Sequence, residues 1–202
     1  MSAHGRHLRW LWARRLLWWV TALAVGLGSA WAVLRGASKH GVPAGPWRAS
    51  TLAGSTEADL YTRARVALGG LLALHREETM YYVAVTDSAG RPLKSGCNYR
   101  VAGQPPKTRW WSVTAYADDL FLFPVAERRY SINSQTATLD AQGRFELVTG
   151  ASAPANAAAY WIPTPGQRGL VFTLRLYNPD PALAAAPATL TPPAIERLGD
   201  CQ

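Results

Sequence analysis

Residues suited to bind a ligand alternate along two predicted strands, at 109–117 and 169–177. Successive side chains of a strand point to opposite faces, so every second residue shares a face. One face of each strand is apolar and suits a core. The other face combines aromatic rings, hydroxyl groups and the guanidinium of Arg175. Such a face could stack on a ligand while Arg175 pairs with a carboxylate or phosphate. The competing interpretation is a solvated outer face with half-buried rings.

Six residues are candidates for a ligand face because they carry rings or hydrogen-bonding groups in or beside predicted strands: Trp110, Tyr116, Asn133, Trp161, Arg175 and Tyr177. Trp161 could line the rim of a cleft or cover the core from a loop. Asn133 closes a predicted strand, where its amide could contact a ligand or bond to the backbone of a turn.

Residues that could perform catalysis are sparse. Only one of the four histidines, His75, lies in the predicted domain, and no nucleophile, phosphate-binding or zinc motif is present. We therefore expect no metal site and no cofactor. Adjacent carboxylates occur at Glu77-Glu78 and Asp118-Asp119, but neighbours on a strand face opposite ways. A pair of carboxylates from distant segments, as in glycoside hydrolases, stays open.

The uncharged run at 16–34, LLWWVTALAVGLGSAWAVL, predicts a transmembrane helix. A helix of this length spans roughly 28 Å, close to a hydrocarbon core of about 30 Å. Arginines flank the run, and tryptophans lie near both of its ends, where aromatic rings favour the headgroup level. We interpret it as an uncleaved signal anchor. The alternative is a signal peptide cleaved near Ala30-Trp31-Ala32, which has the small-x-small form.

The basic charge of the chain is concentrated at this N-terminal segment. Of the formal net charge of +8 over 202 residues, +5 belongs to residues 1–35, which hold five arginines and no acidic residue. By the positive-inside rule, residues 1–15 form a cytoplasmic arm, and the rest of the protein lies on the extracytoplasmic side of the membrane. The remaining +3 is scattered, so nucleic acid is not an expected partner.

The two cysteines, Cys97 and Cys201, indicate a disulfide if the domain is exported. Such a bond would tie the C-terminus to the second predicted strand. The alternative is two unpaired thiols.

Residues 35–54 are rich in Gly, Pro, Ser and Ala and predict a linker, in which Trp47 either docks on the domain or is exposed. Residues 55–202 then form the exported domain. An amphipathic helix is expected at 56–74, with a capping box of Thr56 and Asp59 and an apolar stripe packed on a sheet.

Beyond this helix the hydrophobic period changes to two, which predicts short strands separated by turn signals. The predicted strands are 81–86, 98–102, 109–117, 121–123, 129–133, 137–139, 145–148 and 169–177. Residues 151–159 are expected to form a loop, and residues 181–193 to run extended over the surface. Eight such strands are typical of a mainly-β fold, an antiparallel jelly-roll-like β-sandwich.

Eight short runs occur in order over residues 60–196: ARVALGGLLAL, VAVTDSAGRPL, SGCNYRVAG, RWWSVTAYADD, RYSINSQT, GRFELVTG, YWIPTP and FTLRLYNPD. Together they resemble the bacterial domain of unknown function 1214 family. The resemblance implies a jelly-roll-like sandwich and no established enzymatic activity. It also adds Arg100 to the ligand-face candidates. Members are often small envelope proteins with one membrane segment, and others are fused to, or encoded beside, the domain of unknown function 1254.

We therefore expect a membrane-anchored cell-envelope protein whose β-sandwich acts as a binding module, with a companion-domain protein as its partner. One alternative is an envelope hydrolase acting on a glycan, lipid or ester. A further alternative is an accessory domain without a ligand.

Overall fold

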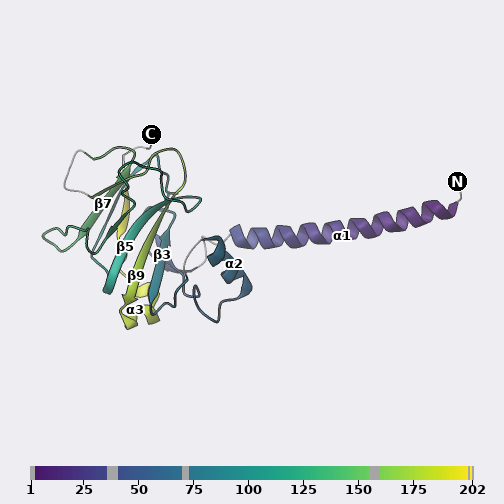
Figure 1. Ribbon diagram of the computed structural model, residues 1–202, viewed down its shortest axis with the longest axis horizontal. Helices are drawn as coiled ribbons and strands as arrows, with labels where there is room; N and C mark the ends of the chain where they lie inside the picture. Colours follow the sequence, from purple (N-terminus) through teal and green to yellow (C-terminus); the bar gives the residue numbers. More distant parts are fainter. Residues whose placement is uncertain (1–2, 36–40, 70–72, 155–159, 200, 202) are drawn as a thin grey trace. The chain divides into compact units, whose positions relative to one another are not determined.

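The computed structural model describes residues 3–35, 41–69, 73–154, 160–199 and 201. The chain divides near residue 39 into two units, which we describe separately. The first holds helix α1, Ala3–Arg35 (Figure 1). Its stretch Trp10–Leu34 is long and apolar enough to cross a membrane and includes the predicted span at 16–34.

The second unit consists mainly of two β-sheets (Figure 1). The larger sheet has the order β1 (Val42–Ala44), β2 (Trp47–Ala49), β3 (Thr79–Ala84), β9 (Leu170–Pro179), β5 (Thr108–Ala117) and β6 (Ser131–Asn133). The smaller sheet has the order β10 (Ala194–Leu198), β4 (Asn98–Gly103), β7 (Phe145–Gly150) and β8 (Tyr160–Pro163).

The two sheets bury a common core between them. The rings of Trp111 and Phe145 lie 4.5 Å apart between centroids, and those of Tyr99 and Phe172 lie 6.4 Å apart, each pair joining one sheet to the other. The residues of β5 and β9 predicted to face inward are buried in the common core, which confirms their assignment to it. Ser112, Thr114 and Thr173, on the other face of the sheet, are buried as well. The mainly-β, two-sheet architecture is therefore confirmed, while its jelly-roll specifics stay a prediction.

Several strands differ from the sequence prediction. Residues 121–123 and 137–139 form no strand, although Leu139 makes an isolated bridge to Phe145. Strands β8 and β10 were not predicted, since Pro163 was read as the start of a turn and the residues before Ala194 as an extended run over the surface. Strands β7 and β8 also pair in parallel, so the expectation of a wholly antiparallel fold is wrong at this pair.

The predicted linker at 35–54 is too long, because β1 and β2 within it join the larger sheet. Trp47 of β2 is fully buried, and its Nε1 donates a hydrogen bond of 2.7 Å to the Pro193 carbonyl. Burial of this large ring against the C-terminal segment explains why so short a strand forms here. Composition alone could not show that contact, since 146 positions separate the two residues.

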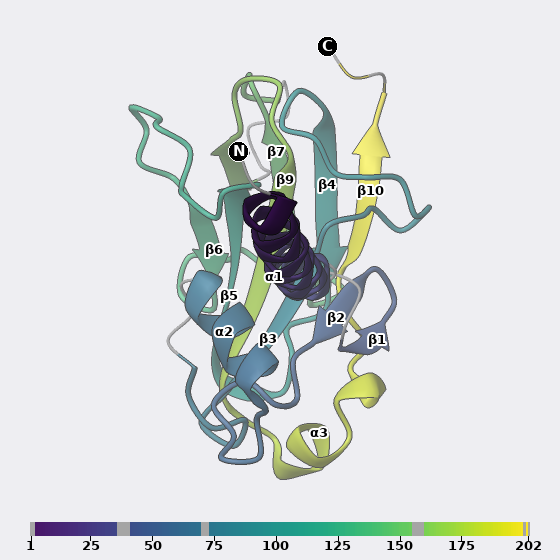
Figure 2. The same cartoon turned by 90° about the vertical axis from the view of Figure 1, so that its right-hand side faces the viewer.

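The helix predicted at 56–74 is shorter, α2 at Leu60–Leu68, and residues 70–72 lie outside the described part. Asp59 rather than Thr56 caps it, because the Asp59 carboxylate accepts the backbone N–H groups of Tyr61 and Thr62. The prediction of a packed apolar stripe is also wrong, since none of its side chains is buried. Figures 1 and 2 together show α2 on the outer side of the larger sheet.

The C-terminal segment forms short helices where an extended run was expected, namely α3 (Pro181–Ala185) and a 3-10 turn, η2 (Pro187–Thr189). Tyr82 of β3 donates its hydroxyl to the Pro187 carbonyl at 3.0 Å, and burial raises the pKa of this phenol to about 12. Further on, Cys201 lies against Cys97 as a disulfide pair with a Cα separation of 4.2 Å, as predicted.

Candidate functional site

The outer face of the larger sheet gathers five of the seven candidate residues. In the strand register, Arg175 of β9 lies between Tyr81 of β3 and Ser112 of β5, and Asn133 of β6 is opposite Ser112. Residues opposite one another in neighbouring strands point to the same face. These four residues therefore form one row across the sheet. We call the surface around this row the Arg175 face.

The guanidinium of Arg175 is held by neutral groups. It donates to the hydroxyls of Tyr116, at 3.0 Å, and Thr114, at 3.3 Å. It also lies 5.5 Å from the ring centroid of Tyr116 and 6.0 Å from that of Tyr81, within the range of a cation–π contact. Arg175 is half-buried and has no carboxylate partner among the described residues.

A second row of the Arg175 face is aromatic. Tyr177 lies opposite both Thr79 and Trp110, and its ring packs edge-on against Trp110 at 5.2 Å. The Oγ1 of Thr79 is buried and has no hydrogen-bond partner within the described part of the chain. Burial raises the pKa of Tyr81, with a further contribution from Tyr177 and an opposing one from Arg175. The Tyr81 hydroxyl therefore stays protonated and able to donate.

Asn133 belongs to the Arg175 face by register, but its side chain supports a turn. Its Oδ1 accepts the backbone N–H groups of Gln135 at 2.9 Å and Thr136 at 3.1 Å. The structure thus favours the turn interpretation for the amide oxygen.

Arg100 and Trp161 lie elsewhere, on strands β4 and β8 of the smaller sheet. Arg100 donates to the carboxylates of Glu146, at 2.8 Å, and Glu196, at 3.3 Å, and both partners raise its pKa. Trp161 donates its indole N–H to the Gly150 carbonyl at 3.2 Å. The seven candidates are therefore divided between two sheets and cannot act together as one site.

Other arginines of the domain also have carboxylate partners. Arg91 contacts Asp87 at 2.7 Å, and Arg168 contacts Asp118 at 3.1 Å and Asp119 at 2.6 Å. Arg175 differs from Arg91, Arg100 and Arg168 because it contacts hydroxyls and rings and, among the described residues, no carboxylate. This difference identifies the Arg175 face as an anion-binding candidate.

The adjacent carboxylates considered for hydrolysis sit in exposed ion pairs. Hydrogen bonding to Arg168 lowers the pKa of Asp119, and the backbone N–H of Glu77 together with Arg76 lowers the pKa of Glu77. A general acid needs the opposite shift, toward a raised pKa. His75 is likewise exposed and contacts Glu77 at 3.4 Å. These groups give the hydrolase alternative no support.

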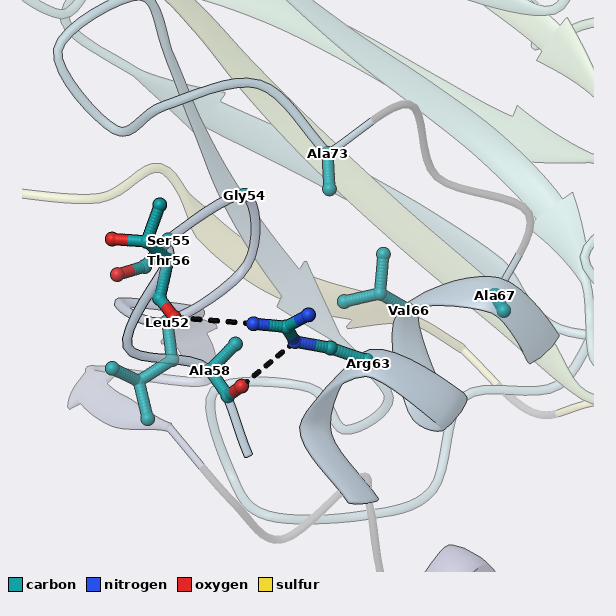
Figure 3. Close-up of a pocket in the computed structure, with 9 residues that line it drawn as sticks. All are labelled: Leu52, Gly54, Ser55, Thr56, Ala58, Arg63, Val66, Ala67 and Ala73. Atoms are coloured by element: carbon teal, nitrogen blue, oxygen red, sulfur yellow. Dashed lines mark hydrogen bonds between the residues drawn. The ribbon is translucent and has the colours of Figure 1, made fainter. Parts of the chain in front are cut away.

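A cavity of about 360 Å³ lies beside α2 and contains none of the seven candidates (Figure 3). Its walls come from residues 52–58, α2 and Ala73. Arg63 points into it, but its Nε donates to the Ala58 carbonyl and its Nη2 to the Thr56 carbonyl (Figure 3). Arg63 therefore ties this segment together.

Two residues of the Arg175 face, Tyr81 and Thr79, were not among the candidates. The alternation of Met80, Tyr82 and Ala84 toward the core places them on the outer face of β3. The run TMYYVA carries that signal, but only the pairing of β3 with β9 reveals that Tyr81 lies opposite Arg175.

Residues 78–181 match a protein family of unknown function, DUF1214. The VPA0106 protein from Vibrio parahaemolyticus has a similar fold, with 22% identity and a TM-score of 0.59, over 72% of this chain and 37% of that chain. An uncharacterised protein from Burkholderia cenocepacia is matched with 18% identity and a TM-score of 0.42, over 88% of this chain and 52% of that chain. This chain thus spans only part of either protein. No curated protein matches it at a significant level.

Proposed function

This chain belongs to the DUF1214 family, and on that premise we propose that it is a membrane-anchored protein of the bacterial cell envelope whose β domain is a binding module. The Arg175 face would be its binding surface. The finer expectation of a jelly-roll topology is part of the same proposal.

Two observations support an envelope location. Helix α1 contains an apolar stretch long enough to span a membrane, and Arg14 and Arg15 lie toward its N-terminal end. This asymmetry favours a cytoplasmic N-terminus and a domain outside the inner membrane. The Cys97–Cys201 pair would then persist as a disulfide, because disulfides are stable in the periplasm and rare in the cytosol.

The environment of Arg175 carries the proposal of binding. A half-buried guanidinium loses part of its hydration, and the hydrogen bonds to two neutral hydroxyls compensate for that loss only in part. A carboxylate or phosphate from a partner would supply the missing negative charge through a two-pronged hydrogen bond. The half-buried ring of Tyr116 would cover the body of the partner and exclude water from the ion pair, while the buried ring of Tyr81 packs beside the guanidinium.

We propose a protein carrying the companion domain, in the same compartment, as the partner. The family resemblance supports this choice, because it implies a companion domain fused to, or encoded beside, family members. The VPA0106 comparison is compatible with it, since the matched fold there occupies only 37% of a longer chain.

The test compares the full chain with two charge-removing variants, Arg175→Met and Arg100→Met. Each protein is expressed in the native host, crosslinked mildly in the membrane and then purified. We expect the wild type and the Arg100→Met variant to recover the same partner and the Arg175→Met variant to lose it. Arg100 is a matched control because it is also half-buried on an outer sheet face but is already paired with two carboxylates.

Arg175→Lys separates charge from geometry, since lysine keeps the charge but cannot form the two-pronged contact. We expect this variant to recover the partner only weakly. Equal recovery by all four proteins would show that the Arg175 face does not bind. A melting-temperature screen with anionic envelope compounds gives an independent readout, because a ligand of the folded state raises the melting temperature.

A further inference from the structure

The loop after β5 displays three apolar side chains in water. Its backbone closes tightly, since the N–H of Ala117 donates to the Phe121 carbonyl and the N–H of Leu120 to the Ala117 carbonyl, both at 2.9 Å. The exposed fractions of Leu120, Phe121 and Leu122 are 40%, 72% and 43%. Soluble domains rarely expose consecutive large apolar residues without a binding role.

The loop that carries these side chains has a strained backbone and is held in place by several contacts. Leu120 has a φ of +66°, in the left-handed region that residues with a side chain beyond Cβ rarely adopt. Arg168 holds the base of the loop by contacting Asp118 and Asp119. A side chain at Gly169 would come within 2.8 Å of the Asp118 Cβ, so a glycine is needed there. The loop is thus a fixed feature of the fold.

Helix α2 extends the apolar surface. A methyl group placed on Gly69, just after α2, would lie 3.9 Å from the Leu120 Cδ1. Leu68 is 67% exposed at this end of α2. We call Leu68, Leu120, Phe121 and Leu122 the apolar rim.

The chain tethers the β domain close to any bilayer that α1 spans. Helix α1 ends at Arg35, and β1 of the domain begins at Val42. The seven Cα–Cα steps from Arg35 to Val42 span at most about 25 Å even when the chain is fully extended. A domain on so short a tether meets the membrane surface at a high effective concentration, so weak insertion of a few side chains is sufficient for docking.

We infer that the apolar rim docks on the bilayer that anchors α1, with Phe121 and its neighbouring leucines inserted at the level of the lipid headgroups. The inference rests on the proposed membrane anchoring. Leu and Phe on an exposed loop and helix are typical of interfacial membrane contacts. Docking would restrict the orientation of the domain and hence the direction from which a partner approaches the Arg175 face.

The test uses the full chain in lipid vesicles, with an environment-sensitive fluorophore on a single introduced thiol. Because Cys97 and Cys201 are bonded to each other, Phe121→Cys provides the one reactive thiol of the described residues. Leu139→Cys is the matched control, since Leu139 is an apolar loop residue, 48% exposed, outside the rim. We expect a blue-shifted emission at position 121, quenched several-fold more by nitroxide-labelled lipid than the emission at position 139.

Each outcome decides a separate question. Equal and weak quenching at both positions, in protein that resists carbonate extraction, would overturn the docking and leave the membrane anchor intact. A blue shift at position 121 without quenching by lipid would show that the rim contacts protein, such as a second copy, and would also overturn it. Release of the protein by carbonate would overturn the proposed anchor and the docking together. An unchanged melting temperature of Phe121→Cys confirms that the variant is folded.

Discussion

Removing the Cys97–Cys201 disulfide is expected to destabilise the β domain strongly. Cys97 is buried just before β4, and Cys201 follows β10, the edge strand that pairs with β4. The bond therefore holds the last strand of the chain on the smaller sheet. The double variant Cys97→Ala/Cys201→Ala releases that strand while keeping small apolar side chains at both positions.

The magnitude follows from the length of the closed loop. The cysteines are 104 positions apart, and cross-linking about 100 residues lowers the entropy of the unfolded chain by an amount worth about 4.7 kcal/mol. This is an upper value, since residual structure in the unfolded state reduces it. For a domain of this size, each kcal/mol lowers the melting temperature by roughly 2–4 °C. We therefore expect a decrease on the order of 10–20 °C.

Intrinsic fluorescence during heating measures this difference in the full detergent-solubilised chain. Trp47 and Trp111 are buried in the domain and report its unfolding, whereas the tryptophans of α1, such as Trp18, lie outside the domain. Wild type treated with a reductant is the control, since it breaks the bond without changing a residue. If the variant and the reduced wild type both have the same melting temperature as the oxidised wild type, this account of stability is refuted. Thiols that react freely in protein isolated without reductant would instead refute the oxidising location.

Three further predictions concern single buried contacts. Asp87 is 2% exposed, and although burial alone would raise its pKa, hydrogen bonds from Arg91 and from the Ala89 N–H outweigh burial and lower it. The ionised Asp87 carboxylate therefore contributes fully to the free energy of unfolding above the pKa of about 3.9 that it has in the unfolded chain. This contribution is lost as the pH falls through the lower pKa that it has in the folded domain. Asp87→Asn should cost about 1–3 kcal/mol at neutral pH in urea unfolding, and the difference should shrink below about pH 4. Tyr82→Phe leaves the Pro187 carbonyl without its 3.0 Å partner and should cost about 1–3 kcal/mol by the same assay. Because burial raises the pKa of Tyr82 to about 12, this phenol should ionise only as the domain unfolds, and absorbance at alkaline pH would detect that ionisation. Ionisation of the folded domain near the ordinary pKa of a tyrosine would contradict the burial of Tyr82. Trp47→Phe removes the buried indole N–H and part of the ring and should cost about 2–5 kcal/mol, whereas a cost under 1 kcal/mol would show that β2 is dispensable.

Local patterns predicted the elements that local physics determines. The alternation in β5 and β9 correctly assigned Trp111 and Phe172 to the core, because a strand turns every second residue to the same side. The apolar run at 16–34 was recognisable for a similar reason, since the length and composition of one helix are sufficient to identify it. Strands β1 and β2 were not predicted, because Trp47 is buried by a segment that is distant in the sequence.

The sequence by itself determined which side chains could bind an anion, since Arg100 and Arg175 both lie in strands beside aromatic residues. Only the tertiary structure decided between them. Arg100 meets two carboxylates, which lie 46 and 96 positions away in the sequence, on the neighbouring strands β7 and β10. Arg175 meets hydroxyls and rings on β5 and β3. The charge beside an arginine depends on strand pairing over long sequence distances, and no local pattern encodes that pairing.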